Sequence, residues 1–347
     1  MTVHALDPFK DHRWQELLET HPRASIFHTP GWLEALRRSY GYKPIVFTTS
    51  SSNCRLTNGI PFCGIDSWLT GSRLVSVAFA DHCDPLVSNA EELRDLLRRL
   101  QSVCSREKYE YIELRILNSD VLPPENHIGL TNSETFSYHE LDLQPDLETL
   151  LRGLHPSCMQ RKIRRAEREG LTYEEGTSDH ILEKFYSLLL LTRRRHNLPP
   201  QPLAWFHSLR DCLGDAFNVR LASKNHQAIA SIITLRFKDT LVYKYGCSDA
   251  RFHAVGAMPY LFWQTIQHAK TLGLRTFDLG RSNLEDQGLV TFKDHLGARS
   301  STLHYYRYPN QSVQRTRHQR SATFRVWSHM PDFLLKAAGN LLYRHVG

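Results

Sequence analysis

The chain has 347 residues, of which 41% are hydrophobic and 23% are charged, and its formal net charge is +7 at pH 7. These values are typical of a globular protein with more than one core, and they exclude a fibrous or disordered chain. The modest basic excess favours anionic partners, whereas no apolar run approaches the roughly 20 residues that span a bilayer.

The first half of the chain predicts two helices, then strands, a long helix and two further strands. The long helix is the clearest element, because the leucines from Leu93 to Leu100 recur at the spacing of one helix face. The expected helices cover residues 14–19, 31–40 and 90–106, and the expected strands cover 44–48, 56–62, 74–79, 111–116 and 138–143.

The second half predicts the same order of elements. Its expected helices cover residues 160–169, 181–195, 202–213 and 258–272, and its expected strands cover 218–222, 228–237, 241–245, 275–279 and 303–308. A loop with a short helix stands before the last strand. The sequence therefore predicts an α/β (α+β) fold of two tandem lobes, each a mixed, mostly antiparallel sheet flanked by helices. We expect lobes at 1–150 and 151–310, with a cleft between them, and a tail at 311–347.

The tail is basic, with six lysines and arginines against the single acidic residue Asp332. Its apolar residues could place a short amphipathic segment on an anionic membrane surface. Packing of the same leucines against the first lobe is the alternative. We expect a cytoplasmic protein, peripheral at the inner membrane face at most.

Three antiparallel strands leading into a strand–helix–strand unit is the order of the GNAT acyltransferase superfamily, which the second half resembles. Residues 251–256 are similar to that superfamily's phosphate-loop pattern, [QR]-x-x-G-x-[GA], with Ala254 in place of the first glycine. Small residues let the backbone approach a pyrophosphate at the start of the next helix. A plain helix-start turn, with Gly256 as a linker, is the alternative.

Further motifs resemble the Fem-like acyltransferases over residues 10–310. They are the basic helix at 161–171, the run Tyr245–Ser248, TFDLG at 276–280 and FKDHLG at 292–297. The similarity is greatest to Fem-like proteins often found near exopolysaccharide or cellulose synthesis genes. Well-studied relatives transfer amino acids from aminoacyl-tRNA to an amine of a peptidoglycan precursor, and often carry a coiled-coil arm that has no counterpart here.

The resemblance implies an N-acyltransferase that moves an acetyl or aminoacyl group from a CoA thioester or an aminoacyl-tRNA. The acceptor would be an amine or hydroxyl of a cell-envelope or polysaccharide precursor. No permanently bound cofactor, metal or DNA partner is expected. A non-catalytic GNAT-like protein that binds an envelope precursor or a synthase is the alternative, favoured by Ala254.

The resemblance also implies three catalytic residues. Lys293 would stabilise the oxyanion, unless it is a surface lysine beside a buried phenylalanine. Asp278 would orient or deprotonate the acceptor amine, or it caps the following turn. Tyr245 would protonate the leaving group, or it is a buried core aromatic.

Four residues are candidates for binding the donor, namely Ser248, Arg251, Gly256 and Arg281. Either arginine could bind phosphate, with a surface salt bridge as the alternative. Asp81, in a polar loop after an expected strand, is the candidate in the acceptor cleft. The seven cysteines form no CxxC pair, and no Cys/His ligand spacing predicts a zinc site or a disulfide framework.

Overall fold

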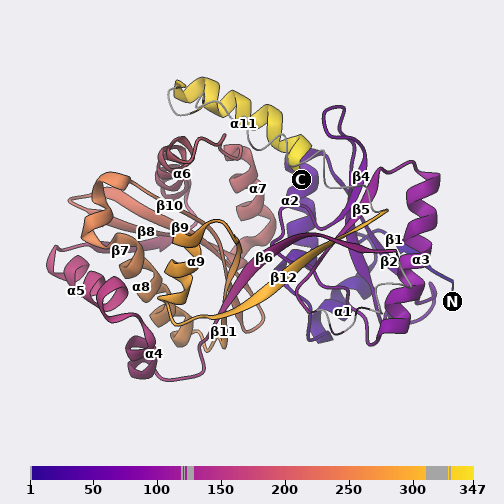
Figure 1. The fold of residues 1–347 in the computed structure, drawn as a ribbon, viewed down its shortest axis with the longest axis horizontal. Helices are drawn as coiled ribbons and strands as arrows, with labels where there is room; N and C mark the ends of the chain where they lie inside the picture. The colour runs from indigo at the N-terminus through magenta and orange to yellow at the C-terminus, as the bar shows by residue number, and fades with distance from the viewer. Residues whose placement is uncertain (1, 119, 121, 123–128, 310–326, 328–329) are drawn as a thin grey trace. The chain divides into compact units, whose positions relative to one another are not determined.

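The structure is a computed structural model that describes residues 2–118, 120, 122, 129–309, 327 and 330–347. The chain forms two compact units, drawn in Figure 1. Unit 1 consists of Met1–Phe136, Thr302–Ala322 and Asn340–Gly347, and unit 2 consists of Ser137–Ser301 and Thr323–Gly339. Two strands, β6 (Thr131–Asp142) and β12 (Arg299–Tyr308), contribute residues to both units.

Unit 1 has the strand order β1-β2-β3-β4-β5-β12. Its pairs are antiparallel except β4 with β5. Helix α3 packs its leucines onto this sheet, and together they form the core of the unit. The bounds are β1 (His4–Leu6), α1 (His12–Thr20), α2 (Pro30–Tyr40), β2 (Lys43–Thr48), β3 (Ile60–Ile65), β4 (Arg73–Ser76), α3 (Ala90–Arg106) and β5 (Tyr111–Ile116).

The prediction for α3 is confirmed to the residue, since Asn89 caps its first turn. Two expected strands are shifted in the structure. The strand expected at 56–62 begins at Ile60, because Gly59 instead forms an isolated bridge with Leu86. The strand expected at 74–79 ends at Ser76, and Phe79 takes a left-handed backbone (φ 57°) that no strand accommodates.

Unit 2 has the strand order β6-β11-β10-β9-β8-β7. Strands β7 to β10 are antiparallel, and β10 and β11 are parallel. The bounds are α4 (Leu147–Gly153), the π-turn η4 (Pro156–Gln160), α5 (Arg161–Arg168), β7 (Thr172–Gly176), α6 (Asp179–Arg195), α7 (Leu203–Leu213), β8 (Phe217–Lys224), β9 (Gln227–Phe237), β10 (Thr240–Ser248), the 3₁₀ turn η6 (Ala250–Val255), α8 (Ala257–Thr271), β11 (Thr276–Asn283) and α9 (Gln287–Asp294).

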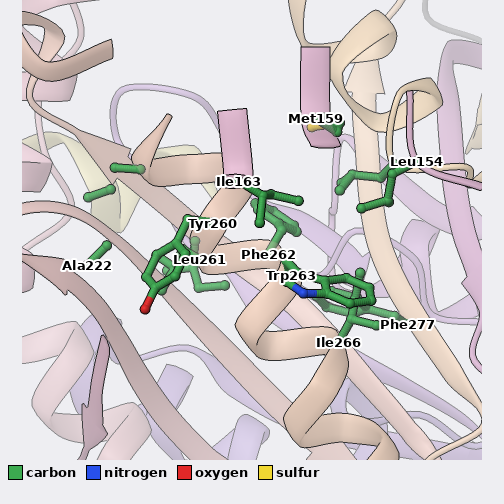
Figure 2. Packing of buried hydrophobic residues seen from close by; sticks show 14 of the residues in the cluster. Leu154, Met159, Ile163, Ala222, Tyr260, Leu261, Phe262, Trp263, Ile266 and Phe277 are labelled. Carbon is green, nitrogen blue, oxygen red and sulfur yellow. The ribbon is translucent and has the colours of Figure 1, made fainter. Parts of the chain in front are cut away.

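Helix α8 is the centre of the unit 2 core. Figure 2 shows its consecutive residues Tyr260–Trp263 among side chains of α5 and η4. Phe262 packs edge-on against Tyr243 of β10 and Phe292 of α9, with ring centroids 5.0 and 5.3 Å apart. Burial of the Phe262 side chain, which is 1% exposed, stabilises the fold by about 1.5–3 kcal/mol. The same contacts fix β10 and α9 relative to α8.

The expected fold class is confirmed, with mostly antiparallel strands flanked by helices. The sequence did not predict β7, α4 or α11 (Asp332–Val346) as elements. Of the expected tail, residues 311–326, 328 and 329 lie outside the described residues. Among the described helices, none combines the length and the apolar character that crossing a bilayer requires.

Candidate active site

Strands β10 and β11 pair only at their beginnings. The parallel register joins Thr240–Val242 to Thr276–Asp278, whereas β10 continues along β9 as far as Ser248. The last residues of β10 therefore extend beyond the segment that pairs with β11. Backbone groups at such an edge can bind the amides of an extended ligand.

A cavity of about 900 Å³ lies beside the last residues of β10, within unit 2. This volume is in the range of small-molecule and cofactor sites. The ends of β10 and α6, the turns η4 and η6, the first turn of α8, and α9 with the loop before it form its walls. The polar side chains that line it include Lys162, Thr192, Arg195, Tyr243, Ser248 and His253.

Tyr243 and Tyr245 face opposite sides of β10, because a bulge separates them. The register with β9 shifts between these two residues, and an extra residue there reverses the usual alternation. Tyr243 lines the cavity. A Cβ on Gly246 would overlap the Tyr243 hydroxyl, so glycine at this position leaves room for that group.

Tyr245, the expected catalytic tyrosine, packs against α7. Trp205 donates its indole N–H to the Tyr245 hydroxyl at 2.8 Å, and the ring lies edge-on to Phe206. Tyr245 is buried and lies outside the lining of the cavity. The structure therefore brings Tyr243, which the sequence did not single out, to the cavity instead.

Ser248 lines the cavity and forms a pair with His253. Its Oγ is 3.0 Å from His253 Nε2. The backbone of Ser248 is fixed from α6, since its N–H donates to Thr192 Oγ1 at 2.9 Å and its carbonyl accepts from Arg195 Nη1 at 3.1 Å. Ser248 therefore presents its hydroxyl group to the cavity beside a histidine, and donor binding by this residue stays a prediction.

Gly256 begins α8 at the edge of the cavity. Its φ of +87° lies in the left-handed region, and an added Cβ would lie 2.6 Å from the Lys162 carbonyl oxygen. Both facts require glycine. The backbone N–H groups at the start of α8 have the orientation that binds anions.

Arg251 and Arg281 are outside the lining of the cavity. Arg251 is largely exposed and bonds Asp249 through Nε and Nη2, and this hydrogen bonding lowers the pKa of Asp249. Arg281 is half-buried on β11, where its carbonyl oxygen accepts a bond from Lys293.

Asp278 and Lys293 meet at Gly280. Asp278 accepts the Gly280 N–H at 2.7 Å, as in the capping alternative. Lys293 is 2% exposed and donates from Nζ to the carbonyl oxygens of Gly280 and Arg281 at 2.9 and 3.1 Å. Neither side chain lines the cavity. The Lys293 bonds join α9, which borders the cavity, to the end of β11, and the Asp278 bond fixes the backbone of β11 at Gly280.

Asp81 belongs to unit 1. It is half-buried, and its carbonyl oxygen accepts a hydrogen bond from the Tyr305 hydroxyl at 2.8 Å. The bond links the loop after β4 to β12 within that unit.

Three histidines of the cavity have lowered pKa values. Burial is the largest cause in each case. The charge of Arg195 adds to it at His196 and His253, and the neighbouring His155 adds to it at His295. These rings are therefore neutral near pH 7, so the fixed positive charge of the lining comes from Lys162 and Arg195.

The cavity residues Tyr243 and Arg195 were not among the expected site residues, and Lys162 was considered only as one cation of the basic helix, which could contact a phosphate-rich donor or a lipid-linked acceptor. No local sequence pattern predicts the bulge between Tyr243 and Tyr245 that directs Tyr243 into the cavity. Arg195 ends an ordinary amphipathic helix, so only the fold shows that it reaches the cavity.

The acetyltransferase (GNAT) domain family matches residues 157–293, a range that holds almost all of the cavity lining. The match covers less than half of the 347 residues, so it shows that this range is similar to that family. The matched range includes β10 and β11, the glycine before α8 and most of the motifs named above. The expected resemblance is confirmed at this level.

Relatives extend the likeness toward the Fem type. The chain is 27% identical over 154 residues to the UDP-N-acetylmuramoylpentapeptide-lysine N(6)-alanyltransferase of Weissella viridescens, a match that covers 43% of this chain and 45% of that enzyme. The match thus spans less than half of the enzyme's length.

Solved structures share the fold over most of the chain. The crystal structure of FemX has a TM-score of 0.71 at 13% identity, covering 92% of this chain and 99% of that one. A tandem GNAT protein from the clavulanic acid biosynthesis pathway has a TM-score of 0.56 at 12% identity, covering 90% and 100%. The expected tandem GNAT-like fold is thereby confirmed.

Proposed function

We propose that the protein is an N-acyltransferase that moves an acyl group onto an amine of a cell-envelope precursor. The observation that carries this proposal is the cavity beside the end of β10 and the start of α8, inside the range that is similar to the GNAT family. The relationship to an alanyltransferase that acts on a peptidoglycan precursor supports the envelope acceptor. A hydroxyl of a polysaccharide precursor is the second acceptor class.

In the proposed reaction the acceptor nitrogen attacks the acyl carbonyl carbon directly. A C–N bond forms, and the C–S bond of a thioester or the C–O bond of an ester breaks. The neutral His253 ring, paired with Ser248, accepts the proton that the amine loses. The Tyr243 hydroxyl donates a proton to the leaving sulfur or oxygen.

The donor is an acyl-CoA or an aminoacyl-tRNA, both of which carry phosphates. Lys162 and Arg195 supply positive charge in the lining, and the start of α8 supplies backbone N–H groups. Asp278 and Lys293 act by positioning: Lys293 holds α9, a wall of the cavity, against the end of β11, whose backbone Asp278 fixes at Gly280. No permanent cofactor enters this scheme.

Calorimetric titration with acetyl-CoA and with alanyl-tRNA tests the proposal. We expect one of the two to bind in a one-to-one ratio, and Lys162→Ala to weaken that binding about tenfold through the loss of one phosphate contact. Lys270→Ala is the matched control, because this lysine bonds carbonyl oxygens of residues 143 and 144 away from the cavity. Binding of neither donor would support the non-catalytic alternative.

We also propose peripheral contact of α11 with an anionic membrane. This helix exposes 69% of Phe333 and 58% of Leu341, together with the cations Lys336 and Arg344. The protein should sediment with phosphatidylglycerol vesicles, and a Phe333→Ser/Leu341→Ser variant should sediment less. Equal sedimentation of the two proteins would contradict the contact.

A further inference from the structure

His155, Cys158 and His295 gather at the wall of the cavity. Their possible ligand atoms all lie within 4.8 Å of one another, and all three residues are partly exposed. In the part of the chain that the structure describes, no other group of three histidine, cysteine or acidic residues has this arrangement. The spacing of histidines and cysteines along the sequence predicts no metal site, because His295, which follows the last residue of α9, is far from His155 and Cys158 in the sequence.

The backbone holds the two segments of this cluster together. The N–H of His155 donates to the carbonyl oxygen of His295 at 2.9 Å, and the two imidazole rings are 4.2 Å apart between centroids. Gly297 follows at φ +75°, and an added Cβ there would lie 3.0 Å from the Gly153 carbonyl oxygen. The close approach is therefore built into the main chain and does not depend on flexible side chains alone.

We propose that His155, Cys158 and His295 form a binding site for a thiophilic divalent metal ion of the Zn²⁺ class. Two imidazoles and one thiolate suit zinc or cobalt, whereas Mg²⁺ and Ca²⁺ prefer oxygen ligands. Ligand atoms around one tetrahedral zinc are about 3.3–3.8 Å apart, given its bond lengths. Small rotations of three partly exposed side chains bring the cluster to that spacing.

The site leaves one coordination position for a ligand other than these side chains. Three protein ligands leave the fourth tetrahedral position to water or to a bound molecule. Cys158 and His295 both line the cavity, so the metal lies at its wall. A thiol or carbonyl group of a molecule in the cavity could occupy the fourth position.

The hydrogen bonds of His155 indicate how its ring changes on binding. Its Nδ1 accepts the Cys158 N–H at 3.2 Å and lies 3.3 Å from Ser157 Oγ. Metal on Nε2 requires a proton on Nδ1, so Nδ1 no longer accepts the Cys158 N–H and instead donates a hydrogen bond to Ser157 Oγ. Ser157→Ala should therefore weaken metal binding about tenfold, as loss of an outer partner does.

Titration of the tag-free, full-length protein with Co²⁺ tests the site. We expect one equivalent to produce visible bands of tetrahedral cobalt and a thiolate-to-cobalt charge-transfer band in the near ultraviolet, and Zn²⁺ to displace it while Mg²⁺ does not. Cys158→Ser should abolish the charge-transfer band, and His295→Gln should weaken binding at least tenfold. The control is Cys54→Ser, since Cys54 is an exposed cysteine of unit 1.

Two results would overturn the proposal: octahedral cobalt bands without thiolate character, or a charge-transfer band that survives in Cys158→Ser. Circular dichroism of each variant shows whether a lost band reflects unfolding, and Cys158→Ala provides a second thiol-free variant. Neither the cobalt spectra nor circular dichroism depends on acyl transfer. The metal site can therefore fail while donor binding persists, and the reverse outcome is equally distinguishable.

Discussion

Tyr243 and Tyr245 lie on opposite faces of β10, because a bulge of one residue separates them. The bulge in β10 gives Tyr243 to the cavity and Tyr245 to α7. Substituting phenylalanine removes only a hydroxyl at either position, so the two variants are matched chemically. Their effects should nevertheless differ in kind.

Tyr243→Phe should lower kcat by about 10²–10⁴-fold, with little change in KM, if this hydroxyl is the general acid. Its melting temperature should stay near that of the parent protein. Steady-state kinetics with the donor found by calorimetry measures the effect. An unchanged kcat would exclude Tyr243 from proton transfer.

The control for that experiment is Tyr245→Phe. This variant leaves the Trp205 indole N–H without its hydroxyl partner, so the free energy of unfolding should fall by about 1–2 kcal/mol in urea titration. Its kcat should be retained. A large loss of kcat with unchanged stability would instead support Tyr245 as the acid.

The site could be predicted from the sequence only where a motif fixes the backbone. Gly256 precedes α8 and Ser248 lines the cavity, and their roles in donor binding stay predictions. Lys293 shows the opposite case, because the motif marks the residue but not the direction of its ammonium group, which bonds two carbonyl oxygens. Side-chain direction depends on packing between α9 and β11, and no local spacing encodes that.

At the scale of elements, the start of α8 is the part most constrained by geometry. Gly256 and Gly273 both have positive φ, and they precede and follow this helix. Of these two glycines, only Gly256 has atoms within 4 Å of an added Cβ, and the nearest of them is the backbone carbonyl oxygen of Lys162. Alanine at Gly273 therefore measures the cost of the left-handed backbone alone. Alanine at Gly256 adds the cost of displacing the Lys162 backbone.

Gly256→Ala should lower the free energy of unfolding by more than Gly273→Ala, whose cost is about 1–2 kcal/mol for the left-handed backbone alone. Gly256→Ala should also weaken donor binding, because the Lys162 backbone and the start of α8 must move apart. Urea titration and calorimetry measure the two effects. Equal behaviour of the two variants would show that the start of α8 is not part of the donor site.

At the scale of the whole molecule, stability in acid depends on His28, a buried histidine of unit 1. Its Nε2 is 2.9 Å from the Asp84 carbonyl oxygen, and its Nδ1 lies 2.9 Å from Ser25 Oγ. Burial lowers the pKa of His28 to about 4 from 6.5. The folded protein therefore holds this ring neutral at a pH where the unfolded chain protonates it.

The stability that His28 contributes is fully present above pH 6.5 and is lost as the pH falls from 6.5 toward 4. The loss is about 1.4 kcal/mol per pH unit and about 3 kcal/mol in total. Urea titrations across this range should show that decline, and His28→Gln should flatten it. A parallel decline in both proteins would assign the effect to other groups.

The order of elements was predictable over most of the chain, because helices such as α3 and α8 carry long apolar faces and the central strands are apolar. Strand β7 has the sequence TYEEG and offers no apolar alternation, so only its pairing with β8 reveals it. Helix α11 follows a basic segment whose charge masks its pattern. Edge elements such as β7 are stabilised by tertiary contacts, which the local sequence does not predict.

The division of β12 between the two units has a consequence for synthesis on the ribosome. Within unit 1, Tyr308 of β12 pairs with Ile112 of β5, and the intervening chain includes nearly all of unit 2. The edge of β5 must therefore wait for its neighbour until the second unit has been translated. N-terminal-first folding is the usual course for multidomain chains, but here the sheet of unit 1 is completed only after most of unit 2 has been translated.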